Sequence, residues 1–203
     1  MKTYQRPATA VEIELEIKRS RFLGLAMPVQ GVEDAQQQLA TIRAAHPHAN
    51  HHCWARISGR PDEVRLWDSS DDGEPRGTAG RPMLQILQHS GLGEVQVVIV
   101  RYFGGIKLGT GGLIRAYGQS TNEALNSLSL ETVEARTDAT LSVPHPLTGE
   151  LEGLIRQLQL PVEERLWQAE YTVEFSLTTE QLSLLRKALG RFAGQYQLKV
   201  NDN

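Results

Sequence analysis

Cysteine is almost absent from this chain of 203 residues, which contains a single one, Cys53. One cysteine excludes a disulfide framework and any zinc site built on several cysteines. Long apolar runs are also missing, because the most apolar stretch, Val95 to Val100, is far shorter than the roughly 20 residues that a membrane-spanning helix needs. The first seven residues contain no apolar segment of a secretory signal. These absences predict a soluble, cytoplasmic protein with no disulfide and no membrane partner.

A strong charge of one sign is missing as well, since the formal net charge is −3. Residues 1–130 carry 14 basic and 13 acidic side chains, a net of +1, whereas residues 131–203 carry 7 and 11, a net of −4. This balance argues against coating of nucleic acid by bulk charge. It leaves room for a local phosphate site in the first part of the chain.

The hydrophobic share of 40% suffices for a core. In residues 1–130 the apolar periodicity and the turn residues predict strands, helices and an acidic loop. The near-continuous apolar run of 95–102 is typical of a central strand. The expected strands are 10–17, 22–29, 52–57, 64–67 and 95–102, the expected helices are 32–45, 82–90 and 113–128, and the loop is 68–80.

In residues 131–203 the same patterns predict strands and helices in the order β-α-β-β-α-β, which is the split βαβ unit of the ferredoxin-like sandwich. Thr178 and Gln181 have the spacing of a capping box at the second helix. The elements are expected at 132–143, 147–158, 162–167, 170–177, 181–189 and 196–200. The sequence therefore predicts an α+β protein with two domains, 1–130 and 131–203.

A glycine-rich segment follows the expected central strand. It has five glycines between Phe103 and Gly112, and no acidic residue occurs from Val95 through Asn122. Glycines let a ligand approach the backbone, and the following helix directs free N–H groups at an anion. The segment lacks the spacing of a P-loop, and the glycines could instead serve backbone geometry alone. The candidate phosphate-binding residues are Arg101, Gly104, Gly105, Lys107, Gly109, Thr110, Gly111, Gly112 and Arg115.

Two other segments add hydrogen-bonding or basic groups. Lys18, Arg19 and Arg21 lie between the first two expected strands, where they could contact phosphate or only keep a sheet edge soluble. The helix after the glycine-rich segment has a polar face that could contact phosphate and sugar or simply face solvent. That face comprises Arg115, Gln119, Asn122 and Asn126.

Carboxylates and histidines cluster in the first domain without a recognised catalytic or metal-binding pattern. Asp71, Asp72 and Glu74 could hold magnesium, but a solvated loop or a helix cap explains them as well. Four histidines between His46 and His52 precede Cys53 with irregular spacing, and Cys53 beside Trp54 is typical of a core. We therefore expect no metal, no cofactor and no catalytic residue.

Four blocks of this chain resemble the IMPACT family, and in particular its enterobacterial members. They are Lys18 to Phe22, His52 to Ala55, Asp71 to Pro82, and Arg101 to Tyr117. The resemblance implies a first domain similar to domain IV of elongation factor G and a ferredoxin-like second domain similar to its domain V. Eukaryotic relatives act in translational control and carry an additional N-terminal domain that binds a partner. This chain starts directly on the shared domain, so their particular partner is not carried over.

These observations lead to three hypotheses for function. The first is an RNA- or ribosome-binding protein that regulates translation, that can have a protein partner there, and that is not an enzyme. The second is an enzyme or binder of a phosphorylated small molecule or nucleotide with magnesium, which requires a pocket between the acidic loop and the glycine-rich segment. The third is a protein–protein adaptor that uses Tyr102, Phe103 and Trp67. Neither the RNA nor the oligomeric state follows from the sequence.

Overall fold

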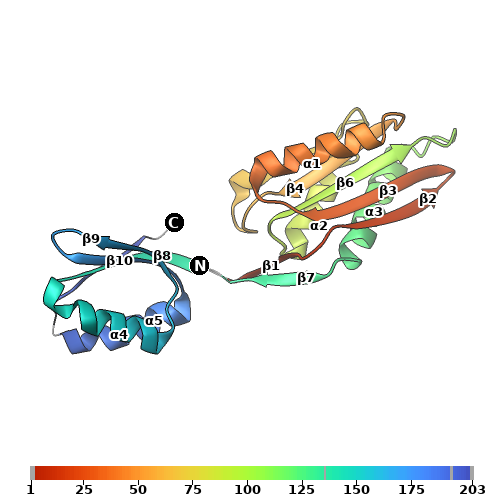
Figure 1. The fold of residues 1–203 in the computed structure, drawn as a ribbon. Helices are drawn as coiled ribbons and strands as arrows, with labels where there is room; N and C mark the ends of the chain where they lie inside the picture. Colours follow the sequence, from red (N-terminus) through yellow and green to blue (C-terminus); the bar gives the residue numbers. More distant parts are fainter. Residues whose placement is uncertain (1–2, 135, 193, 202–203) are drawn as a thin grey trace. The chain divides into compact units, whose positions relative to one another are not determined.

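The computed structural model describes residues 3–134, 136–192 and 194–201. The chain divides into two compact units, Tyr4–Val133 and a second one formed mainly by Glu134–Asn203. Each unit has its own hydrophobic core and combines a sheet with helices (Figure 1). The two-domain α+β class expected from the sequence is therefore observed.

The division falls between Val133 and Glu134, slightly later than the expected position at residue 130. The reason is a pairing that the sequence did not indicate. Strand β7 (Leu130–Val133) is antiparallel to strand β1 (Tyr4–Pro7), and this ribbon belongs to the first unit. The single strand expected over 132–143 is consequently two strands, and residue 135 between them lies outside the described residues.

The first unit contains a five-stranded antiparallel sheet with the order β2-β3-β6-β4-β5. The apolar run of β6 (Val95–Tyr102) forms its central strand, as expected. The other strands are β2 (Val11–Ile17), β3 (Ser20–Pro28), β4 (His51–Ile57) and β5 (Trp67–Ser70).

Two helices cover one face of this sheet, and one helix covers the other. Helices α2 (Gly80–Ser90) and α3 (Thr110–Asn126) pack on one face, and α1 (Gly31–Ala45) packs on the other (Figure 1). Successive residues of β6 alternate between these faces. Val97 and Ile99 belong to the core under α2 and α3, and Val98 belongs to the core under α1. Arg101 continues the row of Val97 and Ile99, so its side chain lies on the α2–α3 face.

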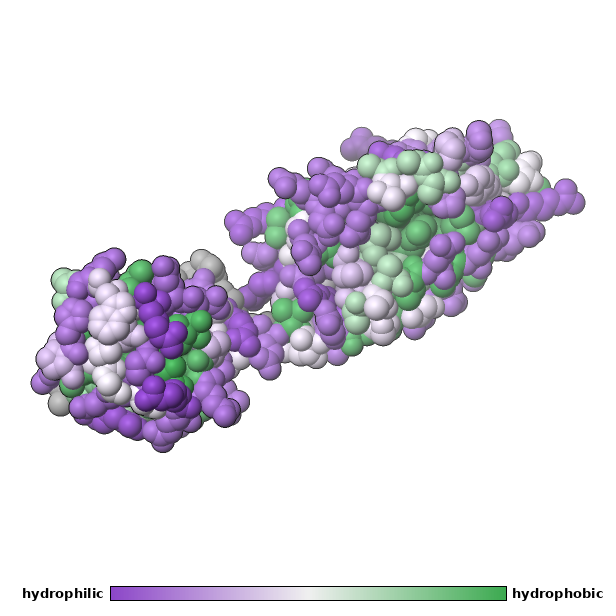
Figure 2. All heavy atoms as spheres, viewed as in Figure 1, coloured by the Kyte–Doolittle hydropathy of each residue, from purple (hydrophilic) through white to green (hydrophobic). Residues whose placement is uncertain are grey.

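The face under α1 is incompletely covered. Figure 2 shows hydrophobic residues between α1 and the neighbouring strands of the first unit. A groove of about 550 Å³ lies there, and its lining includes Leu25, Met27 and Ile42.

The expected hairpin after β4 is displaced along the chain. Residues Val64–Leu66 form a short 3₁₀ helix instead of a strand, and β5 begins at Trp67, which pairs with Ile57. Asp68–Ser70 therefore belongs to β5, and the acidic loop is shorter than expected. The sequence pattern failed here because a strand of only four residues has too few positions to show alternation.

The second unit has the expected order of elements and the sheet order β11-β8-β10-β9. The capping box of Thr178 and Gln181 is present at the start of α5. The apolar residues of β8 and β10 face the helices, among them Leu141 and Phe175. The elements are β8 (Arg136–Val143), α4 (Thr148–Leu158), β9 (Val162–Trp167), β10 (Tyr171–Thr178), α5 (Thr179–Ala188) and β11 (Gln197–Asn201).

Candidate functional site

The basic segment between β2 and β3 is a two-residue hairpin turn. Ile17 pairs with Ser20, and the two residues between them have positive φ angles, 49° for Lys18 and 64° for Arg19. Positive φ at both central positions defines the type I′ turn, which Asn and Gly normally occupy. Lys18 and Arg19 therefore hold a backbone conformation that is costly for their residue type, with both side chains exposed.

The glycine-rich turn packs directly against this hairpin turn. A Cβ atom added to Gly104 would lie 1.9 Å from the carbonyl oxygen of Arg19, so only glycine fits at this position. The Gly104 amide also donates to Ser20 Oγ at 3.2 Å. Two segments more than 80 residues apart in sequence thus form one end of the sheet.

Exposed basic and apolar side chains gather at this end. Phe103 is 45% exposed and Ile106 is 40% exposed, and Lys107 is exposed beside them. Within the described part of the chain, no carboxylate pairs with Lys18, Arg19 or Lys107. We call these five residues, Lys18, Arg19, Phe103, Ile106 and Lys107, the basic end.

Arg21 does not contribute a free charge to the basic end, although the sequence grouped it with Lys18 and Arg19. Its guanidinium donates two hydrogen bonds to the Glu14 carboxylate, at 2.7 and 3.1 Å. Glu14 lies on the adjacent strand, opposite Leu23. The hydrogen bonds from Arg21 lower the pKa of Glu14, so the carboxylate stays charged and neutralises its partner.

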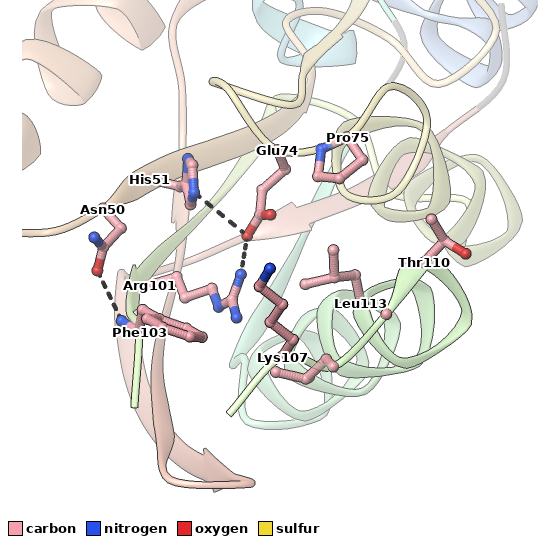
Figure 3. A pocket seen from close by; sticks show the side chains of 11 residues that line it. Asn50, His51, Glu74, Pro75, Arg101, Phe103, Lys107, Thr110 and Leu113 are labelled. Atoms are coloured by element: carbon pink, nitrogen blue, oxygen red, sulfur yellow. Dashed lines mark hydrogen bonds and ion pairs between the residues drawn. The ribbon is translucent and has the colours of Figure 1, made fainter. Parts of the chain in front are cut away.

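A pocket of about 430 Å³ opens between the acidic loop and the glycine-rich turn (Figure 3). Strand β4 contributes His51, the acidic loop contributes Glu74, and β6 contributes Arg101. Lys107 and Thr110 come from the glycine-rich turn and the start of α3. The remaining lining residues are Asn50, Pro75, Phe103, Leu108, Gly109 and Leu113.

A buried ion pair lies against this pocket. Arg101 Nη1 donates to Glu74 Oε1 at 2.5 Å, and both side chains are less than 10% exposed. The Tyr117 hydroxyl donates to the same carboxylate oxygen at 2.8 Å. Glu74 engages Nη1 of Arg101, so the phosphate-binding role expected for Arg101 is limited to the other guanidinium nitrogens. Sequence inspection found no acid near Arg101 along the chain, but Glu74 reaches it from a distant loop.

His51 faces the pocket in a defined tautomer. Its Nδ1 atom lies 2.8 Å from the backbone carbonyl oxygen of Asp72. A carbonyl oxygen only accepts hydrogen bonds, so Nδ1 carries the proton in the neutral ring. The Nε2 atom then has a free lone pair and lies 3.8 Å from Glu74 Oε1. His51 and Arg101 are register partners on adjacent strands, which explains why both reach the same carboxylate.

The other acids of the loop serve the structure of the chain itself. Asp71 accepts hydrogen bonds from the amides of Gly77, Ala79 and Gly80, at 2.7 to 2.9 Å, and so caps the start of α2. Desolvation by burial would raise the pKa of Asp71, but these three amide donors outweigh it and hold the pKa below its usual range. The carboxylates assigned to magnesium in the second hypothesis therefore already have partners.

Asp72 has partners as well, since its carboxylate accepts from Arg43 at 2.6 Å and from the His52 amide at 2.7 Å. Within the described ranges, no group of three or more His, Cys, Asp and Glu residues is placed to hold a metal ion. The candidate histidines separate: His51 faces the pocket, whereas His46 bonds to the Tyr102 hydroxyl.

Cys53 belongs to the core, as its position beside Trp54 indicated. It is fully buried, and its thiol lies 3.3 Å from the Tyr117 hydroxyl and donates to the Asp71 carbonyl. Burial raises the pKa of the Cys53 thiol far above its usual range. A protonated thiol in this environment is a poor nucleophile.

Arg115 does not line this pocket, although the sequence grouped it with Lys107 among the candidate phosphate-binding residues. It lines a groove between α2 and α3, with a volume of about 950 Å³. The polar face expected on α3 is found in this groove, where it comprises Arg115, Gln119, Asn122 and Asn126.

The glycines of the turn serve different purposes. Gly105 and Gly109 have φ angles of +83° and +72°, which other residues rarely adopt. Gly111 has neither a positive φ nor a neighbour within 4 Å of an added Cβ atom. The first amides of α3 have no partner within the helix, and Gly109 at its N-cap provides no side-chain cap.

Comparison with known proteins shows where this architecture recurs. The model of the Impact N-terminal domain matches residues 18–125. The IMPACT family member YigZ of Escherichia coli K12 is 41% identical over 200 residues, which cover 98% of each chain. YvyE of Bacillus subtilis, another IMPACT family member, is 39% identical over 155 residues, 76% of this chain and 70% of that protein. A solved structure described as a hypothetical protein superimposes with a TM-score of 0.79 at 38% identity, covering 100% of this chain and 99% of the other.

Proposed function

The chain belongs to the IMPACT family, and on that basis together with the geometry of the basic end we propose that it binds RNA or the ribosome and regulates translation. In this proposal the two units correspond to domains IV and V of elongation factor G, as the family resemblance implies. The protein acts by binding and not by catalysis. A second protein of the translation apparatus and a cytoplasmic location are part of the same proposal.

The contact between Gly104 and Arg19 is the observation on which the proposal depends most. It joins the hairpin turn to the glycine-rich turn. Lys18, Arg19 and Lys107, which form no ion pair among the residues that the structure describes, therefore belong to one end of the sheet. Phosphate contacts by Lys and Arg dominate affinity for nucleic acid. Exposed aromatic rings such as Phe103 offer stacking surfaces to unpaired bases. The combination favours single-stranded or looped RNA over a regular duplex.

The first unit, and not the second, carries the RNA-binding surface in this proposal. On the β8–β10 sheet of the second unit the outward positions include Asp138 and Glu174, which line a shallow polar pocket. Carboxylates repel phosphate, and the described residues of that pocket's lining include one aromatic ring, Phe175, which is buried. Within the described part of the chain no helix is long and apolar enough to span a bilayer.

The test removes the two hairpin charges without disturbing the turn. Lys18→Asn with Arg19→Gly introduces the residue pair that type I′ turns prefer, so we expect the variant to fold at least as stably as the wild type, and thermal unfolding checks this. We expect this variant to lose cosedimentation with ribosomes and retention of single-stranded RNA. The matched control is Arg186→Gln with Lys187→Gln, an exposed basic pair on α5 of the second unit. Unchanged cosedimentation of the hairpin variant would contradict the proposal.

The pocket favours one alternative, a binder of nucleotides or phosphorylated small molecules. It lies between the acidic loop and the glycine-rich turn, where that hypothesis requires it. Against the magnesium part of the hypothesis, Asp71 and Asp72 are engaged by amides and by Arg43. Calorimetry with a nucleotide panel, with and without magnesium, separates this alternative from RNA binding.

The adaptor hypothesis depended on three exposed aromatic residues. Phe103 is exposed, but Tyr102 and Trp67 are partly buried. The Tyr102 hydroxyl bonds to His46, and the Arg21 guanidinium lies 5.5 Å from its ring centroid. Of the three residues named in the hypothesis, only Phe103 therefore presents an exposed ring.

A further inference from the structure

We propose that the pocket between Glu74, Arg101 and Lys107 binds a phosphomonoester, the terminal phosphate of a nucleotide or of an RNA chain. The proposal rests on the proposed function in that an RNA end would enter the pocket from the basic end. It goes further, because it assigns the pocket a chemical group that the interior of an RNA chain does not have.

Hydrogen-bond donors reach the pocket from two elements, β6 and the glycine-rich turn. The Lys107 ammonium approaches from the glycine-rich turn (Figure 3), whereas Thr110 at the start of α3 lines the pocket with its hydroxyl directed away from Glu74 and Arg101. Arg101 Nη1 bonds to Glu74, while its Nη2 reaches only Ser20 Oγ at 3.4 Å. Its Nε atom is buried without a partner among the described residues. The guanidinium is therefore not saturated by its ion pair, and two cations face one carboxylate in the lining.

Acceptors face the same pocket, which is unusual for a simple anion site. In the neutral form of the His51 ring, the Nε2 lone pair is free, because Nδ1 donates to the Asp72 carbonyl. The Glu74 carboxylate is a second acceptor in the lining. An anion that fits must accept hydrogen bonds from Lys107 and Arg101 and donate one to His51 or Glu74.

Only some phosphate groups satisfy both requirements. A phosphomonoester has a second pKa of about 6, so near neutral pH part of it carries one P–OH donor together with acceptor oxygens. An internal phosphodiester, a sulfate and a carboxylate offer acceptors only. Each of them would place an unpaired anionic oxygen against Glu74, and such contacts between desolvated like charges are costly.

The dimensions agree with this ligand class. The volume of about 430 Å³ lies within the range of roughly 300–1,000 Å³ typical of small-ligand pockets. Phe103 lines the pocket and is 45% exposed, so it can stack on the first base beyond the phosphate. A mononucleotide and the end of an RNA chain both fit this description, and the experiment must distinguish them.

The experiment compares ligands that differ only in the terminal group. Calorimetry measures binding of inorganic phosphate against sulfate, and of a nucleoside 5′-monophosphate against its nucleoside. Fluorescence anisotropy compares 5′-phosphorylated, 3′-phosphorylated and unphosphorylated RNA of one sequence. We expect at least tenfold tighter binding of phosphate than of sulfate, and of the nucleoside monophosphate than of the nucleoside. We expect the same preference for RNA with a terminal phosphate over unphosphorylated RNA. Affinity for the free nucleotide equal to that for the RNA end would identify the mononucleotide as the ligand.

Two variants test the two halves of the argument. Lys107→Gln should weaken phosphomonoester binding about tenfold, whereas Lys187→Gln on α5 should leave it unchanged. His51→Leu removes one of the two acceptors and leaves Glu74 in place, so it should reduce the preference for phosphate over sulfate. The His51 result carries the most weight, because a site that only attracts negative charge would not change its selectivity.

Equal affinity for phosphate and sulfate, with no effect of an RNA terminal phosphate, would overturn the phosphomonoester site. The proposed function fails by a different result. If RNA binds through Lys18 and Arg19 regardless of its ends, only the pocket proposal fails. If nucleoside monophosphates bind in the pocket and RNA does not bind at all, the pocket proposal holds and RNA binding is refuted.

Discussion

Arg101 and Glu74 form a buried ion pair between the central strand of the first unit and the loop before α2, with Nη1 and Oε1 2.5 Å apart. Removing one partner leaves the other charge buried, which typically costs about 3–5 kcal/mol. We expect Glu74→Gln to destabilise the first unit strongly. The double variant Arg101→Met with Glu74→Leu should lose less stability than the sum of the losses caused by Arg101→Met and Glu74→Leu alone. Urea unfolding of the first unit checks this, and additive effects would show that the two residues are not coupled.

Gly104 is required by packing, in contrast to Gly111. Gly104→Ala would force a Cβ atom to 1.9 Å from the Arg19 carbonyl oxygen, so we expect severe destabilisation of the first unit. Gly111→Ala meets no neighbour and should stabilise the protein by about 0.5–1 kcal/mol. Gly149→Ala, at the second position of α4, is the matched control for a helical glycine in open space. Thermal unfolding of all three variants measures the difference.

The cap formed by Asp71 predicts a pH dependence. The pKa of Asp71 is lowered in the folded state, so its contribution to stability is fully present above the unfolded pKa of about 3.9. That contribution is lost as the pH falls through the lower folded pKa. Asp71→Asn should therefore be less stable than the wild type at neutral pH, and the difference should shrink in acid. A constant difference from pH 7 to pH 2 would contradict the assigned role.

Cys53 provides a reporter of opening in the first unit. The chain contains no other cysteine, and Cys53 is fully buried with a raised thiol pKa. A thiol reagent should therefore not label the native protein on the timescale of minutes, and labelling should appear with urea at the transition of the first unit. Rapid native labelling would show that the pocket and the core beneath it open readily.

The backbone conformation of the hairpin turn predicts that replacing Lys18 and Arg19 stabilises the first unit. Lys18 and Arg19 both have positive φ angles, which cost roughly 1–2 kcal/mol for residues other than glycine. Lys18→Asn with Arg19→Gly should raise the stability of the first unit by about 1 kcal/mol, the lower end of that cost. A decrease would show that the two side chains stabilise the turn through contacts, and the variant would then no longer separate folding from binding.

Much of the fold could be predicted from local pattern, because its elements have strong periodicity. The apolar run of Val95 to Val100 indicated the central strand, and Thr178 with Gln181 indicated the start of α5. Strands β1 and β5 are only four residues long, so their own sequence pattern is too short to predict them. Pairing with neighbouring strands determines where they form. The pairing of β1 with β7 also shifts the boundary between the units.

The candidate site was predicted only in part, because the residues that form it lie far apart along the chain. The sequence identified Lys107, Lys18 and Arg19 as basic groups but could not show that Gly104 contacts Arg19. It treated Glu74 as one acid of a loop, although this residue pairs with Arg101. One signal was available: Arg101 occupies the inward position after Val97 and Ile99, where an arginine requires a buried acid as partner.

The central claim is that RNA binds through the cations of the basic end. Its most direct test is the salt dependence of binding of single-stranded RNA by the wild type and by Lys18→Asn with Arg19→Gly. Each phosphate contact in single-stranded nucleic acid contributes about −0.7 to the slope of log K against log salt. Loss of two contacts should therefore make the slope shallower by about 1.4 and weaken binding at low salt. An identical slope and affinity for both proteins would contradict the account.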